Sequence, residues 1–306
     1  MVNETVEEIL ELKKQKNAII LAHNYQRGEI QDIADFVGDS LELSRKAVEL
    51  ECDIIVFCGV HFMAETASIL NPEKTVLLPE IDAGCPMADM IDGEKLTKWS
   101  SQFPNTPVIA YVNTTAEVKA LSYACCTSAN ASEIVKSIPF ERVLFVPDKN
   151  LADWVKRKVP EKEIIPWDGF CPTHHMIKKE DVIRSKQLYP NALVVVHPEC
   201  RPEVIDLADH VASTSGMVRF AKSSSAKEFL IGTETGLIYR LKKENPDKKF
   251  YPLKKTMICP NMKVTTLESV LTALREMKHI IKVREDIRLK AKEAIERMFN
   301  LYKPKN

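Results

Sequence analysis

Several features of common protein classes are missing from this chain of 306 residues. Its 43 basic residues balance 43 acidic ones, which argues against nucleic-acid or anionic-membrane partners. No apolar run approaches the roughly 18–20 residues that a membrane-spanning helix needs. Glycine/serine linkers and low-complexity segments are also missing. We therefore expect tightly docked modules that do not bind nucleic acid or a membrane.

The first 16 residues lack the uncharged apolar core of a secretory signal peptide. Acidic and basic residues alternate there around Val6, Ile9, Leu10 and Leu12, which is typical of an amphipathic helix. We therefore expect a cytoplasmic protein. In that reducing compartment eight cysteines do not predict a disulfide framework, and those in apolar segments such as 54–59 are interpreted as small buried residues.

Three of the cysteines are followed by proline and are almost evenly spaced. They are Cys85, Cys171 and Cys259, which lie 86 and 88 residues apart. Each ends a stretch whose pattern predicts strand, helix, strand, helix, strand, and the proline is typical of a loop after a strand. Three copies of one module, each contributing one thiol, predict a shared three-thiolate site.

The repeat extends to the strands of each module, which are apolar and rich in β-branched residues, as in parallel strands covered on both faces. Strands are predicted over 18–22, 54–57 and 76–78, then 108–110, 143–146 and 164–165, then 193–196, 229–231 and 250–251. A helix is predicted after each first strand, over 31–36, 115–123 and 203–208.

These patterns predict an α/β fold of three homologous three-layer αβα modules with short parallel sheets, arranged with pseudo-threefold symmetry around a central active site. The predicted modules are residues 1–86 with an N-terminal helix, 87–172 and 173–262, followed by C-terminal helices in 263–306. The two terminal helices, over 265–277 and 284–301, are expected to pack outside the third module.

A polar or aromatic residue follows each first strand, and a hydroxyl residue lies 17 positions later in every module. The pairs are His23 and Ser40, Tyr111 and Ser128, and His197 and Thr214. Because ligands of parallel sheets bind beyond the carboxyl ends of the strands, we expect these side chains to converge with the thiolates. Neighbouring loop residues complete the expected set: Tyr25, Asn113, Glu199 and Ser213.

Each of these positions also has a purely structural interpretation. The histidines fit hydrogen-bonded loop residues, the hydroxyl residues fit helix N-caps, the tyrosines fit amphipathic packing, and Glu199 fits a solvated loop acid. The same offset recurs in all three modules, but the polar side chains at the equivalent positions are not the same in each. Such variation favours the binding of an asymmetric small ligand. Hydroxyl groups beside helix N-termini predict a substrate with carboxylates or a phosphate. Glu199 and Tyr25 are candidates for acid–base catalysis.

Three thiolates without an obvious fourth ligand fit two kinds of metal centre. Zinc accepts three protein ligands plus water, and His174, which follows Cys171 by three residues, would complete a Cys₃His structural site. A [4Fe–4S] cluster on three thiolates leaves one iron open as a Lewis acid. Zinc ligands usually come in close pairs, so the wide spacing favours the cluster. The spacing also argues against radical S-adenosylmethionine chemistry.

Over nearly its full length the chain resembles the quinolinate synthase family. The motifs that carry the resemblance are His23-Asn24-Tyr25-Gln26, Gly38-Asp39-Ser40, Phe62-Met63-Ala64-Glu65, Cys85-Pro86-Met87-Ala88, Tyr111-Val112-Asn113, Thr127-Ser128-Ala129-Asn130, Cys171-Pro172-Thr173-His174, His197-Pro198-Glu199-Cys200 and Cys259-Pro260-Asn261-Met262. Some members carry a C-x-x-C-x-x-C motif near the third ligand. Cys259 stands alone here, which argues against a regulatory disulfide.

The resemblance implies an oxygen-sensitive [4Fe–4S] enzyme of NAD biosynthesis. Such an enzyme condenses iminoaspartate with dihydroxyacetone phosphate to quinolinate, with loss of phosphate and water. Its implied functional partner is an iminoaspartate-producing aspartate oxidase or dehydrogenase. The implied cluster ligands are Cys85, Cys171 and Cys259, and the implied catalytic residues are Tyr25, His174, His197 and Glu199. The implied substrate-binding residues are His23, Ser40, Tyr111, Asn113, Ser128, Ser213 and Thr214.

Two other functions fit a three-cysteine site. One is hydroxymethylbutenyl diphosphate reductase, a family similar to this chain in having three modules around a three-cysteine cluster. The local motifs of this chain do not resemble that family. A non-catalytic iron–sulfur sensor or a zinc-stabilised binding module would instead need a partner surface, and this neutral chain has no evident basic patch.

Overall fold

Three parallel sheets form the framework of the computed structural model, which describes residues 2–302. All three share one strand order, with the first strand of each module in an inner position. The orders are β2 (Phe36–Gly38), β1 (Ala18–His23), β3 (Ile54–Cys58), β4 (Thr75–Leu77); β6 (Ala124–Cys126), β5 (Val108–Tyr111), β7 (Arg142–Val146), β8 (Glu163–Pro166); and β10 (His210–Val211), β9 (Leu193–Val196), β11 (Glu228–Gly232), β12 (Lys249–Pro252).

Helices connect the strands within each sheet, link one sheet to the next, and precede and follow the three sheets. They are α1 (Val2–Gln15), α2 (Gly28–Ile33), α3 (Ser40–Glu49), α4 (His61–Leu70), η1 (Ala88–Met90), α5 (Gly93–Ser100), α6 (Ala116–Ala120), α7 (Ala131–Ser137), α8 (Lys149–Lys158), α9 (Pro172–His175), α10 (Lys179–Leu188), α11 (Pro202–Ile205), α12 (Thr214–Ser223), α13 (Leu237–Glu244), η2 (Pro260–Lys263), α14 (Leu267–Glu276) and α15 (Glu285–Leu301). None of these helices is long and apolar enough to cross a membrane.

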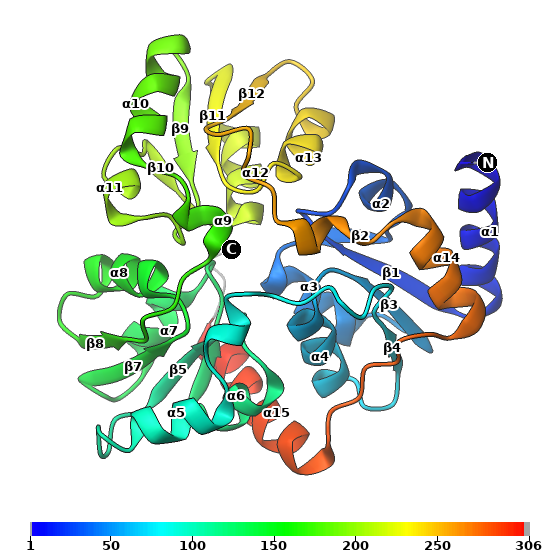
Figure 1. Cartoon of the computed structure of the whole chain (residues 1–306), viewed down its shortest axis with the longest axis horizontal. Helices are drawn as coiled ribbons and strands as arrows, with labels where there is room; N and C mark the ends of the chain where they lie inside the picture. The colour runs from blue at the N-terminus through cyan, green and yellow to red at the C-terminus, as the bar shows by residue number, and fades with distance from the viewer. Residues whose placement is uncertain (1, 303–306) are drawn as a thin grey trace.

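Figure 1 shows the three sheets with their helices as lobes around a common centre. This arrangement confirms the predicted α/β class with three αβα units. The symmetry relation between the lobes and the module boundaries at residues 86, 172 and 262 stay predictions.

The strands are apolar on both faces because each face meets a different core. In β1, Leu21 packs into the large central core, whereas Ile20 and Ala22 pack into a second core that includes Ile9 of α1 and Leu274 of α14. In β9, Val195 belongs to the central core and its neighbours face a third core under α10 and α11. Burial on both faces explains the continuous apolar runs in the sequence.

A repeated lysine supports the repeat at the level of single hydrogen bonds. Lys74 donates to the carbonyls of Ala47 and Leu50 at the end of α3, at 2.9 and 2.8 Å. Lys162 does the same at the end of α7 and Lys248 at the end of α12. A cation at these C-termini satisfies carbonyls that have no partner within the helix and complements the helix dipole.

The sequence prediction missed a short edge strand in each module. The predicted helix over 31–36 ends at Ile33, and Phe36 already belongs to β2. Asp35 accounts for this turn, because its backbone N–H donates to the Ile20 carbonyl and its carboxylate accepts from the Ile20 N–H. Asp209 makes the same two bonds to Val194 beside β9. Each aspartate therefore anchors the chain beside the first strand.

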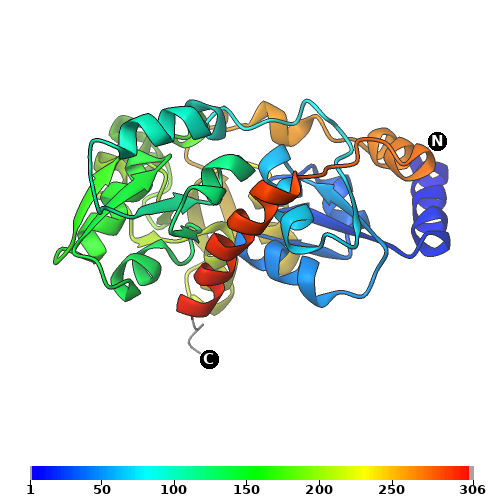
Figure 2. The ribbon, with the colours of Figure 1, turned by 90° about the horizontal axis from the view of Figure 1, so that it is seen from below.

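The prediction that both terminal helices pack outside the third module was wrong. Helix α14 packs against α1 and β3, whereas α15 packs mainly against α6 and β6 and also contacts α4. Figure 2 shows α15, in red, across the junction between the first and second lobes. The tail therefore returns to the beginning of the fold and connects two modules.

Candidate active site

One cavity at the centre of the fold collects the predicted site residues. They lie at the carboxyl ends of the strands and in the loops that follow, so three sheets contribute to one cavity. The predicted residues that line it are Cys85, Cys171, Cys259, His23, Tyr25, Ser40, Tyr111, Asn113, Ser128, His174, His197, Glu199 and Thr214. The offset of 17 residues therefore identified six residues that line the same cavity.

Ser213 is the one predicted residue that does not line this cavity. It is the N-cap of α12, where its hydroxyl accepts from the Gly216 N–H at 3.2 Å and donates to Asp39 at 3.0 Å. Asp39 is in turn the N-cap of α3. The caps are thus Asp39 and Ser213, whereas Ser40 and Thr214 are the first residues of their helices.

His23 and His197 are oriented by the same local hydrogen bond. The Tyr25 N–H donates to His23 Nδ1 at 3.1 Å, and the Glu199 N–H donates to His197 Nδ1 at 3.3 Å. A neutral imidazole that accepts at Nδ1 carries its proton on Nε2. His197 Nε2 lies 3.2 Å from the Ser128 hydroxyl of the second module. Both side chains line the cavity, so the Nε2–H of His197 is a donor within it.

Both of these histidines are neutral at neutral pH. Burial lowers the pKa of His23 to about 3, and the neighbouring His197 adds to this effect. Burial likewise lowers the pKa of His197 to about 3, although Glu199 opposes the shift. The cavity therefore presents imidazole N–H donors without a permanent positive charge.

A chain of hydroxyl and imidazole groups joins the first and third modules. The Tyr25 hydroxyl lies 2.5 Å from Thr233 Oγ1, which lies 2.8 Å from His174 Nε2. Burial raises the pKa of Tyr25 well above its usual range, and so does the nearby Glu199. The same two causes raise the pKa of Tyr111. Both phenols therefore stay protonated and can act as donors.

Glu199 is a buried acid, so its interpretation as a solvated loop residue was wrong. Its Oε2 atom lies 2.7 Å from His174 Nδ1, and its Oε1 atom has no hydrogen-bond partner among the described residues. Burial alone would raise the pKa of Glu199. The nearby His197 and His174 lower this pKa by more than burial raises it, so the net shift is downward. Glu199 is thus a carboxylate with one free acceptor atom.

The three Cys-Pro thiols are half-buried, whereas the other five cysteines are fully buried as expected. Two carboxylates hold the backbone of these cysteines. Asp148 accepts from the Cys171 N–H at 2.9 Å, and Glu234 accepts from the Cys259 N–H at 3.3 Å. Burial raises the pKa of Cys85 to about 12 and also raises those of Cys171 and Cys259, so a bound metal is needed to make them thiolates.

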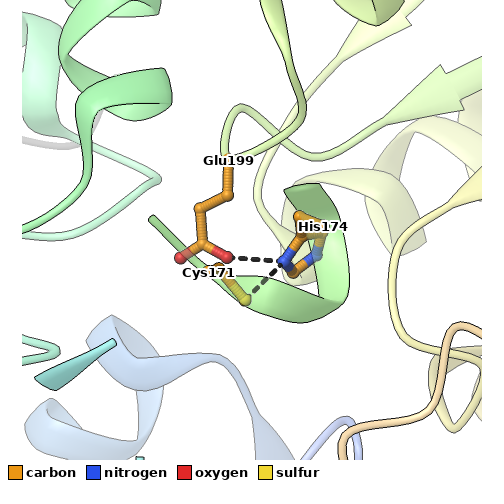
Figure 3. Close-up of side chains that lie close together, drawn as sticks. All are labelled: Cys171, His174 and Glu199. Atoms are coloured by element: carbon orange, nitrogen blue, oxygen red, sulfur yellow. Dashed lines mark hydrogen bonds and ion pairs between the residues drawn. The ribbon is translucent and has the colours of Figure 1, made fainter. Parts of the chain in front are cut away.

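The spacing of the thiols bears on the kind of metal centre. In a tetrahedral zinc site with Zn–S bonds of about 2.3 Å, sulfur atoms lie about 3.8 Å apart. Among the described residues, only Cys171, His174 and Glu199 form a set of three metal-ligand side chains within 4.8 Å of one another (Figure 3). The three thiols share a cavity but are too widely spaced for one ion, which fits a larger polynuclear group.

The search for site residues in the sequence missed Thr233, Asp148 and Glu234. Asp148 follows the end of β7 by two residues, and Glu234 follows the end of β11 by two residues. Alignment of the ends of these second strands would have identified both acids. Apolar residues also line the cavity, and these are Val60, Phe62, Met63, Met87 and Met262.

Comparison with known proteins agrees with this site. The family described as "Quinolinate synthetase A protein" matches residues 7–300. The quinolinate synthase of Thermodesulfovibrio yellowstonii is 76% identical over 98% of this chain and 99% of its own length. Those of Methanosarcina barkeri and Caldicellulosiruptor saccharolyticus are 57% and 58% identical, each over 96% of this chain and 97% of their own. The chain belongs to the quinolinate synthase family.

Proposed function

We propose that this enzyme condenses iminoaspartate with dihydroxyacetone phosphate to quinolinate, with loss of phosphate and water, as a step of NAD biosynthesis. The observation that carries the proposal is the convergence of three thiols with neutral imidazole and hydroxyl donors in one buried cavity. The names of the relatives support this reaction over hydroxymethylbutenyl diphosphate reduction and over a sensor role.

We infer that Cys85, Cys171 and Cys259 hold a [4Fe–4S] cluster. The thiols come from three separate modules, line the same cavity, and are too far apart to share a single ion. When bound, a cluster with three protein ligands supplies an open iron that acts as a Lewis acid on a hydroxyl or carbonyl oxygen. Asp148 and Glu234 position two of the ligand loops through backbone N–H groups.

Substrate anions are bound here without a fixed positive charge, because no lysine or arginine is among the described residues that line the cavity. Ser40 and Thr214, the first residues of α3 and α12, present hydroxyl groups to the cavity, because the caps Asp39 and Ser213 already accept from N–H groups of the first helical turns. His23, Ser128 and the amide of Asn113 add donors. Donors of several types at one cavity fit the carboxylates of iminoaspartate and the phosphate of its co-substrate.

Proton transfers are assigned to two groups on different modules. Glu199 has a free carboxylate oxygen in the cavity and serves as general base. Tyr25 is a protonated phenol whose hydroxyl is connected through Thr233 to His174, so it serves as donor to a carbonyl or hydroxyl oxygen. His174 orients Glu199 through the contact at 2.7 Å. Tyr111 lies near Glu199 and adds a further phenol hydroxyl to the polar groups that line the cavity.

The proposed reaction requires a source of iminoaspartate. An aspartate oxidase or dehydrogenase is the expected supplier, and this link and the cytoplasmic location stay predictions.

An anaerobic assay tests the proposed function. Purified, iron- and sulfide-loaded protein should form quinolinate and release phosphate from iminoaspartate and dihydroxyacetone phosphate. Cys85→Ala should abolish both products, whereas Cys52→Ala, a buried cysteine away from the cavity, should retain them. Quinolinate formation that survives Cys85→Ala would refute the proposal.

A further inference from the structure

Cys171, His174 and Glu199 line the cavity, and their side chains lie close together (Figure 3). His174 Nδ1 lies 3.1 Å from Cys171 Sγ and 2.7 Å from Glu199 Oε2. All the ligand atoms of this triad lie within 4.8 Å of one another. We propose that the cluster-free protein binds one divalent transition-metal ion, such as Zn²⁺, through Cys171, His174 and Glu199, and that this ion competes with cluster assembly.

The chemistry of the triad fits such an ion. Thiolate, imidazole and carboxylate are the usual protein ligands of zinc, and three of them leave a fourth position for water. One thiolate and one carboxylate also balance the double positive charge. This balance matters because the side chains of His174 and Glu199 are only 1% and 4% exposed, and an unbalanced charge is costly at such depth.

A residue behind the triad supports the ligand role of His174. Thr233 Oγ1 lies 2.8 Å from Nε2, on the side of the ring away from Cys171 and Glu199. In the metal-free protein Nδ1–H donates to the Glu199 carboxylate at 2.7 Å; when an ion takes that place, the ring proton moves to Nε2 and donates to Thr233, as outer hydrogen bonds do at known metal sites. Glu199 contributes a second oxygen, Oε1, which has no partner among the described residues. On binding, the Cys171 proton passes to solvent.

The other two thiols lie outside this set of ligand atoms. Among the described residues neither Cys85 nor Cys259 belongs to a set of three ligand side chains within 4.8 Å. An ion in the triad therefore occupies one of the three thiols that the cluster requires. The consequence is competition, in which a zinc-loaded chain cannot accept a cluster until the zinc is removed.

Cobalt titration of anaerobic, cluster-free protein tests the proposal, because Co²⁺ replaces zinc and reports thiolate ligation by a charge-transfer band. We expect one Co²⁺ per chain and a band of single-thiolate intensity. Cys171→Ser should abolish the band, and His174→Gln should weaken Co²⁺ binding by at least about tenfold. The matched controls Cys85→Ser and Cys259→Ser should bind Co²⁺ within about twofold of the parent protein.

Several results would overturn the proposal. These are no stoichiometric Co²⁺ binding, a band of three-thiolate intensity, loss of the band in Cys85→Ser or Cys259→Ser, or unchanged binding in His174→Gln. Circular dichroism of each variant shows whether it is folded, and Glu199→Gln, which keeps the shape of the side chain, supplies a second test of the triad. Protein preloaded with Zn²⁺ should resist iron–sulfide reconstitution until a chelator is added. None of these readouts depends on quinolinate formation.

Discussion

At the scale of single residues, the environment of Glu199 determines what it can do. A carboxylate held by His174 on one oxygen and free on the other is suited to abstract a proton from a bound substrate. Water would hydrogen-bond to a solvent-exposed glutamate and make its carboxylate a weaker base toward the substrate. The neutral rings of His23 and His197 keep the cavity polar without adding a permanent positive charge.

Replacement of Glu199 tests this assignment. We predict that Glu199→Gln lowers kcat by about 10²–10⁴-fold, because the amide cannot accept the proton. Iron content should stay at the parent value, since Glu199 is not one of the three cluster thiols. The surface change Glu161→Gln is the matched control and should leave kcat unchanged. A Glu199→Gln variant with nearly full turnover would contradict the role of general base.

The buried histidines predict a dependence of stability on pH. The pKa values of His23 and His197 are lowered to about 3, so these rings take up protons only when the chain unfolds below pH about 6.5. Stability should therefore fall as the pH is lowered from about 6.5 to 5.5, by about 1 kcal/mol for each ring.

Urea unfolding of the cluster-free protein at these two pH values measures the effect. His23→Gln removes one of the two rings and should reduce the loss of stability by about 1 kcal/mol. The same pH dependence in the parent and the variant would show that His23 is protonated in the folded state.

Many of the residues predicted from the sequence lie at a constant offset in each module. His23 with Ser40 and its two equivalent pairs were identified because the repeat is visible in one dimension. Thr233 was missed because its role depends on contacts with Tyr25 and His174, which are far away in the sequence. Ser213 was assigned to the substrate because an N-cap and a ligand-binding hydroxyl look alike in sequence.

At the scale of elements, helix ends and strand ends position the site. At the C-terminal ends of α3, α7 and α12, backbone carbonyls accept hydrogen bonds from a lysine. This lysine comes from the segment just before the last strand of the same sheet. These bonds tie each helix to the sheet that orients it. The loop residues at its other end then face the cavity.

The lysine caps predict a measurable loss of stability. Lys162→Met removes two hydrogen bonds from the end of α7, at 2.7 and 2.5 Å, and should destabilise the protein by about 1–2 kcal/mol. Lys282→Met, at an exposed position, should change stability by less than about 0.5 kcal/mol. Urea unfolding measures both, and equal stability of the two variants would contradict the role of the cap.

Long apolar strands were predictable from sequence, but the short edge strands were not. β9 was predicted at its observed bounds because it is a run of four apolar residues, three of them buried, in an inner position of a sheet. β2 and β10 have three and two residues and lack a fully buried face, so their pattern carries little signal. Their position depends on Asp35 and Asp209, whose bonds to β1 and β9 appear only in three dimensions.

At the scale of the whole molecule, α15 holds two modules together. Ala291, Ala294, Ile295 and Met298 form its buried face, and the helix packs mainly against α6 and β6. The sequence predicted the helix but placed it beside the third module, because amphipathic periodicity identifies the apolar face of a helix and not the surface it covers.

Truncation of one side chain in α15 tests this bridge. Ile295→Ala should cost about 2–4 kcal/mol, because Ile295 is fully buried and the neighbouring modules cannot close the cavity that it leaves. Leu289→Ala, on the exposed side of the same helix, should cost less than about 1 kcal/mol. Equal losses in the two variants, measured by urea unfolding, would mean that α15 is not packed as described.

The central claim is that three modules place three thiols around one iron–sulfur cluster with an iron open to substrate. Electron paramagnetic resonance of the reduced, anaerobically reconstituted protein, recorded with and without quinolinate, tests it most directly. The account predicts a cluster signal that changes shape when quinolinate is added and that is lost in Cys85→Ser, Cys171→Ser and Cys259→Ser. A protein without a cluster signal, or a signal that quinolinate leaves unchanged, would contradict it.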